Sequence, residues 1–253
     1  MPASLPPGYT VTLNDMQMYY VLAGQGEPLV LLHGYTGASN DWSVYFDDLV
    51  KEYQLIIPDL RGHGRSTNAL KEFTFQQAAR DLAALLDHLG IERFKAIGIR
   101  GGGNLLLHLA TQQPSRVVAM VLISATTHYP EQARPFMRNY TIDQLPEEER
   151  RLLQQRHIRG DQQIQELFRQ GRSFADDHED MNFTAATLST ITPRTLILYG
   201  DRDPLYPIHI ALDLYTAIPH SYLWVIPNGG HVPLKNLPFI PTVLPFLRGD
   251  WRE

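Results

Sequence analysis

Three ionisable side chains stand where apolar runs of this 253-residue chain give way to turns: Arg100, Asp203 and His231. A histidine can take a proton from a nucleophile, and a carboxylate can orient and charge-balance that histidine. Arg100 lies between Gly98 and Gly101 in a segment that reads as strand, tight turn and helix. This frame is typical of a nucleophile elbow, whose middle residue is a serine. The three positions predict an acyl-transfer site in which Arg100 stands at the position of the serine.

Arg100 cannot supply the missing nucleophile. Its guanidinium stays protonated under ordinary conditions, so it offers hydrogen-bond donors and no lone pair for attack. Loss of the serine from such a site lowers kcat by about 10⁶-fold. A cation at the start of a helix also costs about 0.3 to 1 kcal/mol, because the helix dipole favours negative charge there. A contribution to stability therefore does not account for the arginine.

Alternating strands and helices are expected to position these residues. Apolar runs predict eight strands, at about 9–14, 17–23, 28–32, 54–58, 93–98, 117–123, 194–199 and 222–226. The clearest helix is expected from Phe75 to Leu89, with Thr74 and Gln77 at capping-box spacing and Gly90 as the stop. This alternation predicts a mostly parallel sheet covered by helices on both faces. The first two strands are expected to form an antiparallel hairpin at one edge.

The chain order of elbow, aspartate and histidine resembles that of the α/β-hydrolase superfamily. The resemblance runs from about Tyr9 to the C-terminus and includes the turn PDLRGHGRS at 58–66. It implies an α/β-hydrolase fold, with a mostly parallel eight-stranded sheet flanked by helices and a helical lid. It also implies an esterase or lipase-like activity that proceeds through an acyl-enzyme. The elbow serine of that family is replaced here by Arg100.

The resemblance assigns a role to each candidate residue. His231 is expected to be the base. Asp203 is preferred to Asp201 as the acid, because it lies in the turn proper, where members of the family place the carboxylate. The backbone N–H groups of Tyr35 and Gly101 are the expected oxyanion donors, and a change of side chain at the elbow leaves them in place.

Other residues receive structural interpretations. His33 is expected to be a buried ring that braces its turn. Ser66 and Ser124 follow turns or strands but lack the glycine frame of an elbow, so they are interpreted as ordinary turn residues. The glycine run at 101–103 lacks the Lys-Ser/Thr pair of a phosphate loop, and close packing of a helix on a strand is the simpler account of it.

The segment between the sixth and seventh strands is much longer than a crossover requires and is predicted to be a helical lid. Two helices are expected, from Pro146 to Gly160 and, capped by Asp161, to Gly171, with a weaker third beyond them. Their expected apolar positions are Leu152, Leu153, Ile158, Ile164, Leu167, Phe168, Phe174, Met181 and Phe183. These side chains would either line an acyl pocket or pack the lid onto the core. The predicted division is a core of 1–124 and 190–253 and a lid of 125–189.

Composition limits the partners. A net charge of −5 and a pI near 6.0 give no basic surface for nucleic acid. The absence of cysteine excludes disulfides, thiolate catalysis and cysteine metal sites. His209, His220 and His231 are not at metal-ligand spacing, so neither a metal nor another cofactor is predicted. The expected partner is a small-molecule ester or acyl substrate, and the oligomeric state is left open.

The sequence also bears on localisation. Its first eight residues lack a basic start and an apolar core, so no secretory signal is expected. No stretch approaches 18 consecutive apolar residues, so no membrane span is expected. A cytoplasmic protein is the resulting prediction.

Three functions remain open on this reading. The first is a carboxylic-ester hydrolase scaffold that is inactive or strongly impaired because Arg100 replaces its nucleophile. The second is an enzyme without an acyl-enzyme, a lyase or general-base hydrolase, in which Asp203 and His231 act on water or substrate while Arg100 anchors an anion. The third is a non-catalytic ligand-binding protein. The completeness of the hydrolase frame favours the first.

Overall fold

The computed structural model describes residues 5–234 and 237–251 of the chain. Within them, eight strands form one sheet in the order β1-β2-β4-β3-β5-β6-β7-β8. The strands are β1 (Tyr9–Leu13), β2 (Met16–Ala23), β3 (Glu27–Leu32), β4 (Tyr53–Pro58), β5 (Phe94–Ile99), β6 (Val117–Ile123), β7 (Arg194–Gly200) and β8 (Ser221–Ile226). Strand β2 pairs antiparallel with β1 and β4, and the other pairings are parallel. The eight predicted strands and the edge hairpin are confirmed.

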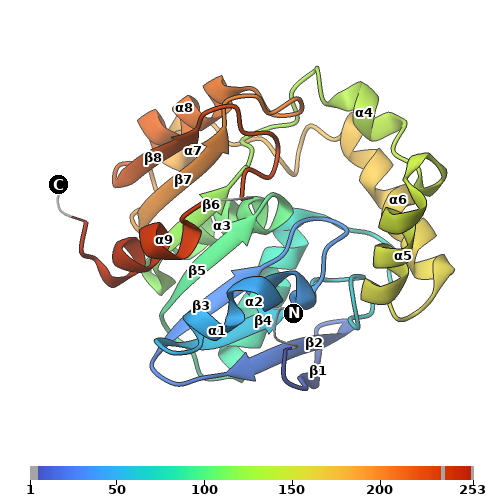
Figure 1. The fold of residues 1–253 in the computed structure, drawn as a ribbon, viewed down its shortest axis with the longest axis horizontal. Helices are drawn as coiled ribbons and strands as arrows, with labels where there is room; N and C mark the ends of the chain where they lie inside the picture. Colours follow the sequence, from blue (N-terminus) through green and yellow to red (C-terminus); the bar gives the residue numbers. More distant parts are fainter. Residues whose placement is uncertain (1–4, 235–236, 252–253) are drawn as a thin grey trace.

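Helices cover both faces of the sheet (Figure 1). Helices α1 (Ser43–Leu49) and α9 (Phe239–Arg248) pack on one face, and α2 (Phe75–His88), α3 (Gly101–Gln112) and α8 (Ile208–Ala217) on the other. Alternate residues of β3 enter the two cores: Val30 and Leu32 face α2 and α3, whereas Leu29 and Leu31 face α1 and α9. A strand buried on both sides reads as a continuous apolar run, which is why it was recognisable in the sequence.

The helix after the 58–66 turn begins where the capping pattern places it. The hydroxyl of Thr74 accepts a hydrogen bond from the N–H of Gln77 at 3.0 Å. Helix α2 ends at His88, and Gly90 follows it at a φ of +67°, a conformation that glycine adopts without strain. The N-cap is therefore confirmed, and the helix is one residue shorter than predicted.

Close contact between α3 and the sheet explains the glycine run. A Cβ atom on Gly102 would lie 2.5 Å from the carbonyl oxygen of Leu32, and one on Gly98 would lie 2.5 Å from the backbone of Gly102. Backbone at these separations leaves no room for a methyl group. Helix packing, rather than a phosphate loop, accounts for these glycines.

Gly102→Ala is therefore expected to lower the free energy of unfolding by about 1 to 3 kcal/mol, because the added methyl group overpacks the helix against β3. Urea titration measures the loss. Gly230→Ala is the matched control, since a Cβ there would meet no atom within 4 Å. Equal stability of the two variants would contradict the packing argument.

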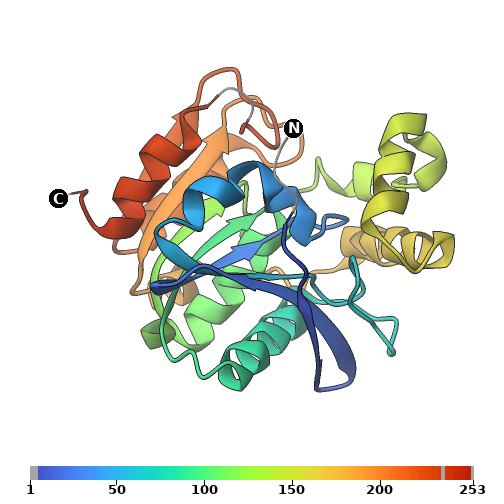
Figure 2. The same cartoon turned by 60° about the horizontal axis from the view of Figure 1, so that its bottom comes forward.

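Most of the segment between β6 and β7 forms a group of helices beside one end of the sheet (Figure 2), whereas its last helix, α7, packs on the core against α3 and α8. The segment contains α4 (Arg134–Arg138), α5 (Glu147–Arg156), α6 (Asp161–Ser173) and α7 (Ala185–Leu188), with the 3-10 turns η3 (Ile142–Gln144) and η4 (Phe174–Asp176). Two further 3-10 turns, η1 (Ser39–Trp42) and η2 (Pro114–Arg116), lie in the core region. We retain the division into core and lid, at 124/125 and 189/190, as a proposal.

Several lid predictions were wrong in detail. Helix α5 ends at Arg156 rather than Gly160, and Leu152 and Ile158 are 37% and 61% exposed, so neither faces the interior. Asp161 is the first residue of α6 instead of its cap, and the helix continues to Ser173.

The other expected apolar positions of the lid differ in the element and the cluster to which they belong. Phe174, Met181 and Phe183 do not share a helix. Leu153, Ile164 and Phe168 are buried in a small cluster of the lid itself. No helix in residues 5–234 or 237–251 is long and apolar enough to cross a membrane.

Candidate active site

Arg100 occupies a strained turn between β5 and α3. Its φ and ψ are 52° and −112°, a conformation that non-glycine residues rarely adopt. Its N–H donates to the carbonyl of Ile123 at 2.7 Å, which ties the turn to β6. The absence of side chains at Gly98 and Gly102 lets the helix approach the strand here. The elbow geometry is thus present, with an arginine at its apex.

His231 and Asp203 form a hydrogen-bonded pair. The ring Nδ1 of His231 lies 2.7 Å from Oδ2 of Asp203, which is buried. The other carboxylate oxygen accepts the N–H groups of Leu205 and Tyr206 at 2.8 and 3.0 Å. These backbone donors fix the carboxylate, so Nδ1 carries the proton and Nε2 is left as the basic nitrogen. Asp201 instead lies 3.9 Å from Arg202.

Burial and charge lower the pKa of His231 and so favour its neutral form. Burial lowers the pKa of His231, the hydrogen bond that its ring donates to Asp203 raises it, and the nearby Arg100 cation lowers it further. Tyr206, which the sequence did not single out, packs its ring edge-on at 4.9 Å from the His231 ring. Burial raises the pKa of Tyr206 to about 12. A neutral imidazole with a free Nε2 is able to act as a general base near neutral pH.

The two expected oxyanion donors lie close together. A Cβ on Gly101 would sit 3.2 Å from the backbone nitrogen of Tyr35. Neither N–H donates to another group in the part of the chain that the structure describes. Unpaired backbone donors beside a strained elbow are the arrangement that binds a developing oxyanion.

The arginine side chain leaves the elbow along the turn at 33–37. Its Cβ and Cδ lie 3.5 Å from where a Cβ on Gly34 would be. It reaches a cavity of about 330 Å³ that is lined mainly by backbone and apolar groups: Gly34, Tyr35, Thr36, Gly37, Asp41, Val44, Tyr45, Ile99, Arg100, Arg156, Val232 and Leu234. Arg156 pairs with Asp41 at 2.8 Å. Among the described residues, the Arg100 guanidinium has no ion pair or hydrogen bond.

Aromatic rings from the core and the lid cover the other side of the elbow. The Tyr35 ring contacts Phe73 and Phe174 edge-on at 5.3 and 4.9 Å, and Phe75 lies 5.5 Å from Phe174. Tyr129 stacks on Phe174 at 5.6 Å. Phe174 and Tyr129 are the lid residues of this group, so the lid contributes directly to an apolar surface beside the elbow.

The alternative chemistries find less support in the geometry. Ser66 is buried, and its hydroxyl donates to Asp59 O at 2.6 Å and accepts from Tyr19 N–H. Ser124 is buried at the end of β6 without a glycine frame. His33 is fully buried and braces its turn through Gly34 O and Leu60 N–H, as expected. In residues 5–234 and 237–251, no group of three or more His, Cys, Asp or Glu could hold a metal ion.

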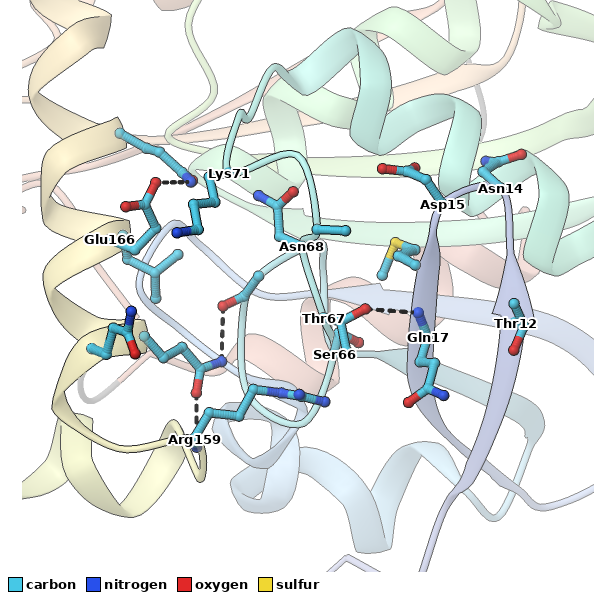
Figure 3. A pocket seen from close by; sticks show the side chains of 17 residues that line it. Thr12, Asn14, Asp15, Gln17, Ser66, Thr67, Asn68, Lys71, Arg159 and Glu166 are labelled. Atoms are coloured by element: carbon cyan, nitrogen blue, oxygen red, sulfur yellow. Dashed lines mark hydrogen bonds between the residues drawn. The ribbon is translucent and has the colours of Figure 1, made fainter.

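A larger cavity of about 610 Å³ lies elsewhere, between the β1–β2 hairpin, the 62–71 segment and α6. Figure 3 shows Gln17 of the hairpin and Glu166 of the lid on opposite sides of Asn68. Amide and hydroxyl side chains dominate its lining, and Arg100, Asp203 and His231 are not among them. The smaller cavity is therefore the better candidate for chemistry, because it adjoins the elbow.

Residues 27–187 match the family described as alpha/beta hydrolase fold. The chain belongs to this family. A soluble epoxide hydrolase of Corynebacterium sp. (strain C12) is 37% identical over 98 residues, which are 39% of this chain and 34% of the relative. A putative 2-succinyl-6-hydroxy-2,4-cyclohexadiene-1-carboxylate synthase of Bacillus subtilis (strain 168) is 34% identical over 122 residues, 46% and 44% of the two chains. The α/β-hydrolase chain thus spans less than half the length of these curated relatives.

Solved structures resemble the chain over almost its whole length. A mutant meta-cleavage product hydrolase from Pseudomonas fluorescens IP01 superposes with a TM-score of 0.78 at 22% identity, covering 97% of this chain and 99% of the other. A thermophilic esterase from Thermogutta terrifontis gives 0.76 at 21% identity, with 96% and 99% covered. At these identities the likeness establishes the fold.

Proposed function

We propose that the chain carries the site of a carboxylic-ester hydrolase in which Arg100 stands in place of the acyl-accepting serine, so that it is inactive or strongly impaired on esters. The observation that carries the proposal is the Asp203–His231 pair, 2.7 Å apart and next to a strained elbow. Such a pair serves no need of a protein that only binds a ligand.

Each group has a defined task when serine stands at 100. His231 Nε2 takes the hydroxyl proton while the serine oxygen bonds to the ester carbonyl carbon, and Asp203 holds the ring and balances its charge. The N–H groups of Tyr35 and Gly101 stabilise the oxyanion. The alcohol leaves with the proton from His231, and water then hydrolyses the acyl-enzyme with the same histidine as base. Arg100 lacks the lone pair for the first of these steps.

The test is hydrolysis of short- to medium-chain p-nitrophenyl esters by the chain and by its Arg100→Ser variant. A large gain supports the proposal, and no gain in a folded variant overturns it. The aromatic surface at Phe174 and Tyr129 favours an uncharged, moderately hydrophobic acyl group.

A second function is favoured by the guanidinium of Arg100, which has no ion pair within residues 5–234 and 237–251. An arginine without a counter-ion beside an apolar cavity is suited to a carboxylate with a hydrophobic body. In this alternative His231 acts as a general base on water or on a substrate C–H or O–H, and no acyl-enzyme forms. The Bacillus subtilis relative is named as a synthase of a carboxylate, which agrees with an anion in the site.

Phenylacetate binding distinguishes this alternative. Loss of a charge-assisted hydrogen bond costs about 1.5 to 3 kcal/mol, so Arg100→Met is expected to weaken binding by about 10- to 100-fold. Titration calorimetry at low salt measures the affinity, and Arg151→Met, on an exposed lid position, is the control. Equal affinities for the chain and Arg100→Met would exclude an anion anchor at the elbow.

A further inference from the structure

Two hydrogen bonds join the lid to the oxyanion loop, which we define as residues 33–37. The hydroxyl of Tyr35 donates to the carbonyl of Leu167 in α6 at 2.8 Å. The ring Nε2 of His157, just after α5, lies 3.1 Å from the carbonyl of Thr36. Both contacts link lid residues to the loop that holds the proposed donor N–H of Tyr35.

The protonation of His157 follows from its partners. Its Nδ1 accepts the N–H of Gly64 at 3.0 Å, so Nδ1 holds the lone pair and Nε2 carries the proton that Thr36 O accepts. The ring is fully buried. A single lid side chain therefore bridges the oxyanion loop and the turn at 61–66.

Thr36 shows why this bridge matters. Its φ is +64°, a left-handed conformation that costs a β-branched residue free energy and persists only where the surroundings fix it. Its N–H donates to Nε2 of His63 at 3.1 Å, and its carbonyl accepts from His157. Two buried histidines, one of them in the lid, thus hold both backbone polar groups of this residue.

We propose that His157 and the hydroxyl of Tyr35 are positioning residues through which the lid sets the direction of the Tyr35 N–H. The inference rests on the proposed function for its catalytic consequence. Because the peptide of Thr36 directly follows Tyr35, release of its carbonyl lets the loop relax from the strained conformation and moves the donor away from the oxyanion. The lid therefore orders the catalytic machinery in addition to covering it.

Matched variants separate positioning from simple packing. His157→Gln keeps one donor and one acceptor on a side chain of similar reach, whereas His157→Leu keeps an apolar bulk and loses both. Tyr35→Phe removes only the bond to Leu167, and Tyr222→Phe, on the edge strand β8, is its control.

The kinetic measurement uses these substitutions in the Arg100→Ser background. Loss of one oxyanion donor costs about 10² to 10³ in kcat, so His157→Leu is expected to lower kcat by about 10- to 100-fold with little change in KM. His157→Gln is expected to retain most of the kcat that His157→Leu loses. Tyr35→Phe is expected to lower kcat by less than His157→Leu does. Unchanged kcat in His157→Leu, or a loss that His157→Gln shares in full, would overturn the proposal.

Amide hydrogen exchange tests the link without activity, in the chain with Arg100 in place. Peptides covering 33–37 are expected to exchange at least about tenfold faster in His157→Leu but not in His157→Gln, while peptides of β5 are unchanged. Faster exchange throughout the chain would indicate a merely structural role and contradict the inference. If exchange behaves as expected while Arg100→Ser is inactive, the proposed function fails and the structural link stands.

Discussion

Arg100→Ser is expected to raise the rate of p-nitrophenyl butyrate hydrolysis by at least about 10³-fold over the chain with arginine. In the proposed site the base, its carboxylate and the two backbone donors are His231, Asp203 and the N–H groups of Tyr35 and Gly101, so the substitution would add the nucleophile that the proposed site lacks. Serine also removes a cation that lowers the pKa of His231, and a more basic imidazole accepts the hydroxyl proton more readily. Initial rates across acyl chains of increasing length measure the effect and the preference.

Two controls assign the gain to the nucleophile. Arg100→Ala empties the elbow without adding a hydroxyl, so it is expected to remain near the rate of the unsubstituted chain. Addition of His231→Ala to the serine variant removes the base and is expected to abolish most of the gain, because the members of a triad act as a unit. A gain equal in Arg100→Ala and Arg100→Ser would show that the guanidinium merely blocks access to the site.

Mass spectrometry of the serine variant adds a second line of evidence. An acyl-enzyme has the mass of the chain plus the acyl group, and it accumulates when deacylation is slower than acylation. Labelling at residue 100 is expected in Arg100→Ser and not in Arg100→Ala. A fast variant that never shows the adduct would favour direct attack by water and hence the general-base alternative.

The centre of the sheet could be predicted because its strands are buried on both faces. Leu29 to Leu32 form a continuous apolar run whose alternate residues enter opposite cores, and β6 behaves similarly. The end of α5 could not be predicted in this way. His157 has φ and ψ of −104° and 89°, outside the helical region, because its ring inserts between backbone groups of Thr36 and Gly64. Thr36 and Gly64 are distant from His157 in the sequence, so the spacing of apolar residues near His157 cannot indicate these contacts.

The candidate site also contains residues that local sequence patterns indicate and residues that only tertiary packing brings there. Asp203 and His231 could be proposed from chain order and from their place after strands, and the structure brings them together. Arg156 reaches the cavity only through the packing of the lid, so no local pattern in the sequence indicates its place there. Tyr206 could have been predicted as a residue of the site, because it lies three residues after Asp203 in the same turn. The catalytic roles of Asp203 and His231 stay predictions.

The buried histidines are expected to make stability fall as the pH drops from about 6.5 towards 4. His33, His63 and His157 are fully buried, and burial is the main cause that lowers the pKa of each. A group whose pKa is lower in the folded chain stabilises it above the unfolded pKa, and that stability is lost on acidification because the unfolded chain binds the proton first. The pKa of His157 falls from 6.5 to about 4, which corresponds to about 3 kcal/mol of lost stability by pH 4.

Urea unfolding at pH 7, 6, 5 and 4 measures this loss, and His157→Gln isolates the contribution of one ring. Burial is the largest cause of the lowered pKa of His157. The hydrogen bond to the Thr36 carbonyl and the charge of Asp59 oppose it, whereas His33 and Arg156 add to the lowering. Carboxylates that titrate in the same range contribute equally to both proteins and cancel in the difference. The stability advantage of the chain over His157→Gln is therefore expected to shrink by about 3 kcal/mol between pH 7 and pH 4. A difference in the free energy of unfolding that does not change with pH would mean that the pKa of His157 is ordinary. The neutral ring, on which the two hydrogen bonds of His157 and the link from lid to oxyanion loop depend, would then not be required by the fold.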